Sequence, residues 1–196
     1  MTRVRLGNDA HWSAQWVEVD LSAEPQEWAA TTVSRRWASQ RLDDDRVRIE
    51  AITASIARIV ASLDAPTLKA ALLLHPIPGE PVITVVGVCT VDAAPGLTLD
   101  ALGDQLCVPE EMLETPRDRS LLETPAGAAV RLVQRYRESL APGVEEIREH
   151  LAYGWLVADH GKGTVVTVST VFVDLVAAST WTTAVDELAQ SLTTGT

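Results

Sequence analysis

The sequence contains few of the residue types that build metal-dependent or redox sites. Its 196 residues include two cysteines, Cys89 and Cys107, and four histidines. The two thiols are 18 positions apart, which matches no zinc or redox spacing. We interpret them as small core residues of a protein in a reducing compartment.

Long apolar runs are missing as well. No stretch approaches the roughly 18–20 apolar residues that a membrane-spanning helix needs. The segment Met1–Trp12 carries two arginines but no apolar core behind them, so it does not resemble a signal peptide. These features predict a cytoplasmic protein without membrane insertion.

Positive charge is also scarce. Lysine and arginine together number 16 against 27 aspartates and glutamates, which gives a formal net charge of −11. Such a surface repels a phosphate backbone unless its few cations gather on one face, and it mainly supports solubility. We therefore expect no nucleic-acid partner.

The histidines form no recognisable metal-binding pattern. His11, His75, His150 and His160 lack a second histidine, cysteine or carboxylate at ligand spacing, except for Glu146 four residues before His150. We interpret His160 as a polar turn residue rather than as an exposed catalytic imidazole. The sequence predicts no metal and no cofactor.

Motifs for phosphate binding and nucleophilic catalysis are incomplete or missing. The segment Gly161–Thr164 reads Gly-Lys-Gly-Thr, but Leu156 stands where a phosphate-binding loop needs its first glycine. The segment also joins two expected strands and therefore offers no helix N-terminus. The Gly-x-Ser-x-Gly elbow does not occur, and adjacent pairs such as Glu110-Glu111 are typical of solvated surface. No catalytic residue is predicted.

Apolar residues recur at helical spacing in four segments. The first helix is expected to begin at Pro25, the second at Asp43–Asp45, whose carboxylates can cap it, and the third to span Thr98–Cys107. Ser179 is expected to cap the fourth. In the second helix the apolar stripe is Ile49, Ile52, Ile56, Ile59 and Leu63, with Arg48, Thr53, Arg58 and Ser62 facing water.

Alternating or continuous apolar runs indicate strands, most of them in hairpins. The expected strands cover residues 16–20, 67–75, 82–91, 127–137, 147–157 and 163–173. The last is apolar on both faces, which is typical of a central strand covered on both sides. The segment Pro109–Pro125 has three prolines and many charges, so we expect it to cross the surface as a loop.

This order of elements predicts an α+β fold. Hairpin links favour a largely antiparallel sheet of six or seven strands. Helices early and late in the chain favour cover on both faces, hence a three-layer α/β/α sandwich. We expect a single domain over residues 1–196, with residues 1–13 as a candidate flexible N-terminal segment.

One strand carries a cluster of positive charge. Alternation over residues 127–137 places Arg131, Arg135 and Arg137 on one face, and Arg148 is expected opposite them on the next strand. Guanidinium groups bind carboxylates and phosphates in bidentate fashion, so these four residues are a candidate interaction surface for an acidic partner segment or an anionic ligand. Alternatively, they protect a sheet edge or pair across the hairpin. The glutamates available for such pairing are Glu145, Glu146 and Glu149.

The chain resembles a known fold family over most of its length. The features that carry the resemblance are Thr124-Pro-Ala-Gly127 leading into Ala129-Val-Arg131, a strand containing Tyr153, a glycine turn, a valine-rich strand and a last helix ending Leu188-Ala-Gln-Ser-Leu192. With this order of elements the chain resembles the Mog1/PsbP-like α/β/α sandwiches, and more closely the uncharacterised actinobacterial-type proteins of that fold. The resemblance implies a binding, assembly or accessory role and carries over no functional residue.

These observations favour a non-enzymatic binding or accessory protein that acts through contact with a partner protein. One alternative is an enzyme or small-ligand binder with a pocket between helices and sheet, which a histidine and a carboxylate in a deep cavity would favour. Another is a structural subunit of a larger assembly. No motif identifies the partner, the ligand or the oligomeric state.

Overall fold

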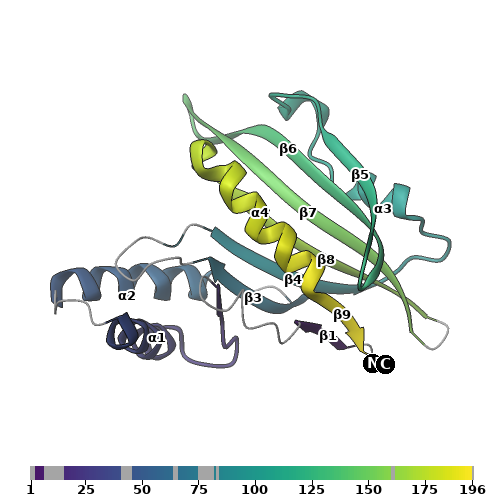
Figure 1. Cartoon of the computed structure of the whole chain (residues 1–196). Coiled ribbons are helices and arrows are strands. Elements are labelled where there is room, and N and C mark those ends of the chain that lie inside the picture. Colours follow the sequence, from purple (N-terminus) through teal and green to yellow (C-terminus); the bar gives the residue numbers. More distant parts are fainter. Residues whose placement is uncertain are drawn as a thin grey trace.

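A computed structural model describes residues 3–6, 16–40, 46–63, 66–74, 82, 84–159 and 162–195 of the chain. This part forms one α+β domain with four α-helices and a seven-stranded antiparallel sheet (Figure 1). His11, His75, His160 and the Asp43–Asp45 cluster lie outside the described residues. The helices are α1 (Pro25–Gln40), α2 (Arg46–Ala61), α3 (Leu99–Gln105) and α4 (Leu175–Ser191), with a 3-10 turn η2 (Glu110–Met112).

The main sheet has the strand order β2-β3-β4-β8-β7-β6-β5 and is antiparallel throughout. Its strands are β2 (Trp16–Glu18), β3 (Leu68–Leu74), β4 (Thr84–Asp92), β5 (Asp118–Thr124), β6 (Gly127–Ala141), β7 (Val144–Asp159) and β8 (Lys162–Phe172). The valine-rich β8 lies between β4 and β7, as its two apolar faces predicted.

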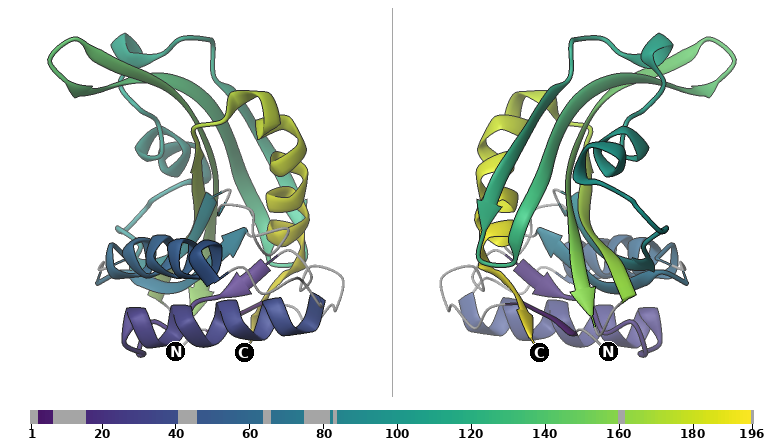
Figure 2. Two further views of the ribbon diagram at one scale, coloured as in Figure 1. Left: turned by 90° about the vertical axis from the view of Figure 1, so that its left-hand side faces the viewer. Right: turned by 90° about the vertical axis from the view of Figure 1, so that its right-hand side faces the viewer.

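Helices cover both faces of the sheet, which confirms the three-layer arrangement. On one face Ala71 and Leu73 of β3 pack with Val33 of α1 and Ile56 of α2, and α3 covers Val130 of β6 on the same side. The alternate residues of the strands face α4 on the other side. Figure 2 shows α4 and α3 on opposite sides of the sheet.

The α4 face holds the larger core. Leu151, Tyr153 and Trp155 of β7 are buried there against Val185 and Leu188 of α4. The apolar stripe expected for this helix is therefore its sheet-facing side. The stripe of α2 is confirmed in the same way, although Thr53, expected to face water, is buried.

The prediction that Pro109–Pro125 is an irregular loop is wrong, because this segment contains the strand β5. Pro116 and Pro125 flank this strand instead of interrupting it. β5 is the end strand of the sheet and pairs only with β6, so charged residues such as Asp118 and Glu123 remain exposed. An edge strand of this kind lacks the apolar alternation by which strands are recognised in a sequence.

Two further differences concern the ends of the domain. Helix α4 begins at Leu175, capped by Asp174, whose Oδ1 accepts hydrogen bonds from the N–H groups of Val176 and Ala177, so Ser179 is not its cap. Within the N-terminal segment that we had considered flexible, β1 (Arg3–Leu6) pairs antiparallel with β9 (Leu192–Gly195). Neither strand was expected from the sequence.

Candidate protein-interaction surface

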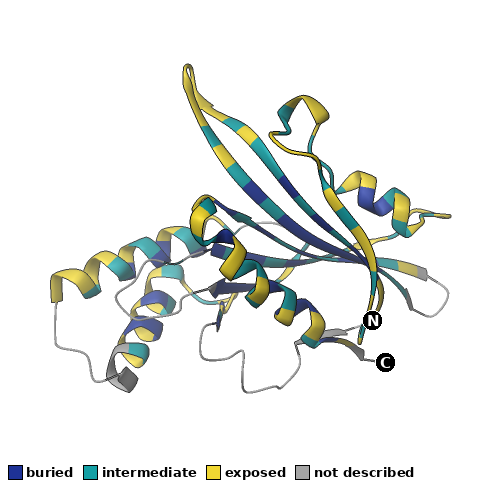
Figure 3. Cartoon of the chain, turned by 45° about the horizontal axis from the view of Figure 1, so that its top comes forward, coloured by how far each residue is buried: buried dark blue, intermediate teal, exposed yellow. Residues whose placement is uncertain are grey.

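The hairpin formed by β6 and β7 extends beyond the rest of the sheet. β5 begins at Asp118, opposite Val133, and β8 ends at Phe172, opposite Glu149. Between these points residues 134–148, here called the arm, pair mainly with each other. In Figure 3 the strands are buried at mid-length and exposed at the tip of the arm.

The root of the arm is fixed by Gln134, which is almost fully buried. Its Oε1 accepts a hydrogen bond from Val108 N–H at 3.0 Å, and its Nε2 donates to the carbonyl oxygen of Leu106 at 2.9 Å. The same Nε2 lies 2.9 Å from Nδ1 of His150, which must therefore accept. Burial lowers the pKa of His150, in agreement with a neutral ring.

Arg131 lies below the arm in a partly buried polar cluster that joins the sheet to α4. Its Nε and Nη2 donate to the two carboxylate oxygens of Asp186 at 3.2 and 3.1 Å, and Nε also approaches the hydroxyl of Tyr153. Tyr153 donates to Asp186 Oδ1 at 2.6 Å. Burial is the largest single influence on Arg131 and lowers its pKa, but the interactions with Asp186 and Tyr153 together outweigh burial and raise the pKa. Burial and then Asp186 raise the pKa of Tyr153, so this hydroxyl stays protonated.

On the α4 face of the arm the arginines are held by glutamates. Arg135 Nη2 lies 2.8 Å from Glu149 Oε2. Arg137 contacts two carboxylates: Nη2 lies 2.6 Å from Glu114 Oε1, and Nη1 lies 2.8 Å from Glu145 Oε2. Because Glu114 precedes β5, Arg137 ties the arm to the segment beside it.

Arg148 does not lie with the other three arginines. It is paired with Tyr136, which alternates with Arg135 and Arg137 and therefore faces the opposite side of the sheet. There its Nη1 lies 2.5 Å from Glu138 Oε2, and its Nε donates to Glu146 at 2.7 Å. Arg135, Arg137 and Arg148 thus brace the arm from both faces, whereas Arg131 lies below it and binds Asp186 of α4.

The structural alternative for these arginines, pairing across the hairpin, is therefore observed. Arg135 and Arg137 pair across the hairpin with Glu149 and Glu145, two of the glutamates identified in the sequence. Arg148 contacts the third, Glu146, on its own strand, and its partner across the hairpin is Glu138. Contact of the same arginines with a partner stays a prediction. The sequence did not reveal Glu114 and Asp186, which are distant in the chain from the arginines they bind.

The tip of the arm exposes apolar side chains. Leu140, Val144 and Ile147 are 51%, 51% and 39% exposed, on either side of the turn at residues 141–143. The arm carries equal numbers of opposite charges, three arginines (Arg135, Arg137 and Arg148) and three glutamates (Glu138, Glu145 and Glu146), in a chain with a net charge of −11. Residues 144–148 also have β6 on one side and no further strand among the described residues on the other. The three apolar positions beside a turn were the signal that sequence reasoning overlooked.

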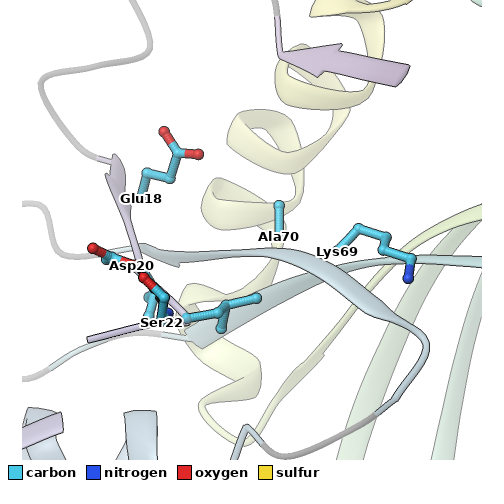
Figure 4. A pocket seen from close by; sticks show the side chains of 7 residues that line it. Glu18, Asp20, Ser22, Lys69 and Ala70 are labelled. Carbon is cyan, nitrogen blue, oxygen red and sulfur yellow. Dashed lines mark hydrogen bonds between the residues drawn. The ribbon is translucent and has the colours of Figure 1, made fainter. Parts of the chain in front are cut away.

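A hollow at the opposite end of the sheet offers a weaker site. It encloses about 510 Å³ beside β2 and β3 and is lined by Glu18, Val19, Asp20, Leu21, Ser22, Lys69 and Ala70. The charged ends of Glu18 and Lys69 point away from each other (Figure 4). Asp20 accepts hydrogen bonds from Ser22, which lower the pKa of Asp20 and close a local turn. His150, the histidine that the structure describes, is not part of this lining.

Other site types have no support among the described residues. No group of three or more histidine, cysteine, aspartate or glutamate side chains could hold a metal ion there. In the same part of the chain, no helix has the length and apolarity needed to cross a membrane. Cys89 and Cys107 are free thiols and half-buried, and Cys107 Sγ lies 3.2 Å from the carbonyl oxygen of Gly103.

Comparison with known proteins gives a limited result. No protein-family model matches the chain, and no curated protein matches it in sequence. Among solved structures it is similar to LpqN of Mycobacterium tuberculosis, described as involved in cell envelope biogenesis, with 12% identity and a TM-score of 0.49. The match covers 68% of this chain and 75% of LpqN. At this similarity the match supports no conclusion about function.

Proposed function

We propose that this protein is a non-enzymatic binding module that contacts a partner protein through the tip of the β6–β7 arm. The observation that carries the proposal is the exposure of Leu140, Val144 and Ile147 on a hairpin that extends past its own sheet. Exposed apolar side chains are often found at protein contacts, and here they occur on both faces of the arm: Val144 lies on the Arg148 face, and Ile147, opposite Arg137, lies on the α4 face. The arm has no net charge of its own, so it adds nothing to the repulsion that the acidic remainder of the chain would impose on an acidic partner.

In this proposal the arginines act mainly by holding the arm in one conformation. Arg137 connects the arm to Glu114 and Glu145, and Arg148 connects Glu138 to Glu146. A surface that is ordered before binding loses less conformational entropy when the complex forms. The unpaired edge of residues 144–148 additionally offers backbone groups to an extended partner segment.

Two finer assignments belong to the same proposal. The layer arrangement agrees with a Mog1/PsbP-like sandwich, a family whose members act as binding, assembly or accessory proteins. The free thiols of Cys89 and Cys107 agree with a cytoplasmic location.

The proposal is tested by affinity capture from cells that contain the natural partners. We expect Ile147→Glu to lose proteins that the wild type captures, because the substitution puts a charge into the apolar tip. Val176→Glu is the matched control, since Val176 is 93% exposed on α4 and lies outside the arm. Equal recovery by Ile147→Glu and the wild type, with both proteins folded by circular dichroism, would remove the arm from consideration.

A further inference from the structure

β5 leaves the sheet with an open edge that is separate from the arm. It is the end strand, and its seven residues pair with β6 without a register shift. Edge strands are usually protected by charged side chains, proline or a bulge; Asp118–Thr124 contains no lysine, proline or bulge, and its charges are Asp118, Arg119 and Glu123. At its centre Leu121 is 59% exposed. An edge with these properties is able to pair with another strand.

The helices leave this edge accessible. α3 contacts β6 and β7, and α4 contacts β7 and β8, so both lie inward of β5. Arg119 reaches from β5 to Asp100 and Asp104 of α3, which places its side chain over one face of the sheet and not beyond the edge. Because neighbouring strands are about 4.8 Å apart, a further strand beside β5 would meet neither helix.

We propose that β5 pairs with the β5 strand of a second copy of this chain, antiparallel and with Leu121 on the two-fold axis. A two-fold interface of this kind uses the same residues on both sides. In this register Leu121 faces the partner subunit's Leu121, and Arg119 faces the partner subunit's Glu123. Asp118 faces the partner subunit's Thr124, so no like charges stand directly opposite each other.

The alternative registers are less complementary. A shift by two residues in one direction places Arg119 opposite the partner subunit's Leu121, and in the other direction it places Leu121 opposite the partner subunit's Glu123. The other end of the sheet is less suitable, since β2 has only three residues. Asp100 and Asp104 already pair with Arg119, so the attraction between Arg119 and the partner subunit's Glu123 is reduced. A single pairing of edge strands is a small interface, and we therefore infer a reversible dimer.

Sedimentation velocity over a concentration series tests this inference. The wild type should shift from monomer to dimer mass as concentration rises. Leu121→Asp, which places two carboxylates together at the axis, should remain monomeric. Glu123→Arg places an arginine opposite Arg119 at both symmetry-related positions of the interface. It should raise the dissociation constant of the dimer roughly tenfold. Glu111→Arg makes the same charge change at an exposed position outside β5 and should dimerise like the wild type. A wild type that stays monomeric, or a Leu121→Asp variant that dimerises equally, overturns the inference.

A cross-linking variant keeps the inference testable if Leu121→Asp fails to fold. In a background with Cys89→Ala and Cys107→Ala, Leu121→Cys should form a disulfide-linked dimer under mild oxidation. Residues directly opposite in an antiparallel pair have Cβ atoms roughly 4.5–5.5 Å apart, near the separation that a disulfide bridges. Val176→Cys in the same background is the control and should stay monomeric. Equal cross-linking at both positions contradicts the proposed axis. Because β5 is distinct from the tip of the arm, either proposal can fail without the other.

Discussion

Two arginines on the same face of β6 show how burial changes the role of one residue type. Arg131 has a side chain that is 17% exposed, and it is fixed between Asp186 and Tyr153 beneath α4. Arg137, six residues further along, is 49% exposed and bridges Glu114 and Glu145 in the arm. A charge that is partly buried becomes costly when its partner is removed, whereas an exposed pair is weakened by water and salt. We therefore assign Arg131 to the stability of the domain and Arg137 to the shape of the arm.

The largest expected effect on stability is at the partly buried pair of Arg131 and Asp186. Asp186→Ala should lower the free energy of unfolding by about 2–3 kcal/mol, because it removes charged hydrogen bonds to the partly buried Arg131 and leaves it with the longer contact to Asp118. Denaturant unfolding measures this loss. Glu187→Ala, at an exposed position on the same helix, is the control and should be nearly neutral. If the two variants are equally stable, the cluster around Arg131 does not join α4 to the sheet energetically.

The next effect concerns the root of the arm. Gln134→Ala should cost about 1–3 kcal/mol, since it leaves the N–H of Val108 and the carbonyl of Leu106 without their partner in a partly buried position. The same unfolding experiment applies, with the exposed Gln190→Ala as control. If Gln134→Ala leaves the free energy of unfolding unchanged, water replaces the glutamine as hydrogen-bond partner. The root of the arm would then be as accessible to solvent as its tip.

A smaller effect is expected from pH. The pKa of His150 is lowered in the folded state, so below about pH 6.5 the unfolded chain binds more protons than the folded one. His150 should therefore contribute stability that is complete above pH 6.5 and is lost as pH falls through the lower folded value, by at most about 1.4 kcal/mol per pH unit. The unfolding free energy of the wild type minus that of His150→Asn, measured from pH 7 to 5, isolates this contribution. A difference that does not change with pH, or that grows as pH falls, would be inconsistent with a neutral His150.

The smallest effect on global stability is expected in the arm itself. Arg137→Ala removes a pair that is about half exposed and Arg148→Ala one that is partly exposed, so the unfolding midpoint should change little. Hydrogen exchange should nevertheless become faster for the backbone amides of residues 144–148, because the strands lose their braces. Amides of β8 serve as the internal reference. Unchanged exchange in both variants would show that backbone pairing alone orders the arm.

Much of the fold could be predicted from the sequence because burial leaves a periodic pattern. The stripe around Ile56 and the two apolar faces of β8 each reflect a local relation between side-chain spacing and a covered surface. β5 could not be recognised in this way, since an edge strand is covered less and keeps its charges. The site was only partly predictable for a related reason. The arginines were visible in one strand, but Asp186 approaches Arg131 only after the chain has folded. Strand alternation alone also could not place Arg148, whose face depends on the register between β6 and β7.

The contact role of the arm is tested most directly by site-specific photo-cross-linking in cells. A photoreactive residue at position 147 should yield a discrete adduct with another protein, whereas the same residue at position 176 should yield none. Adducts of equal yield at both positions, no adduct at position 147, or an adduct of the chain with itself there would contradict the proposed contact.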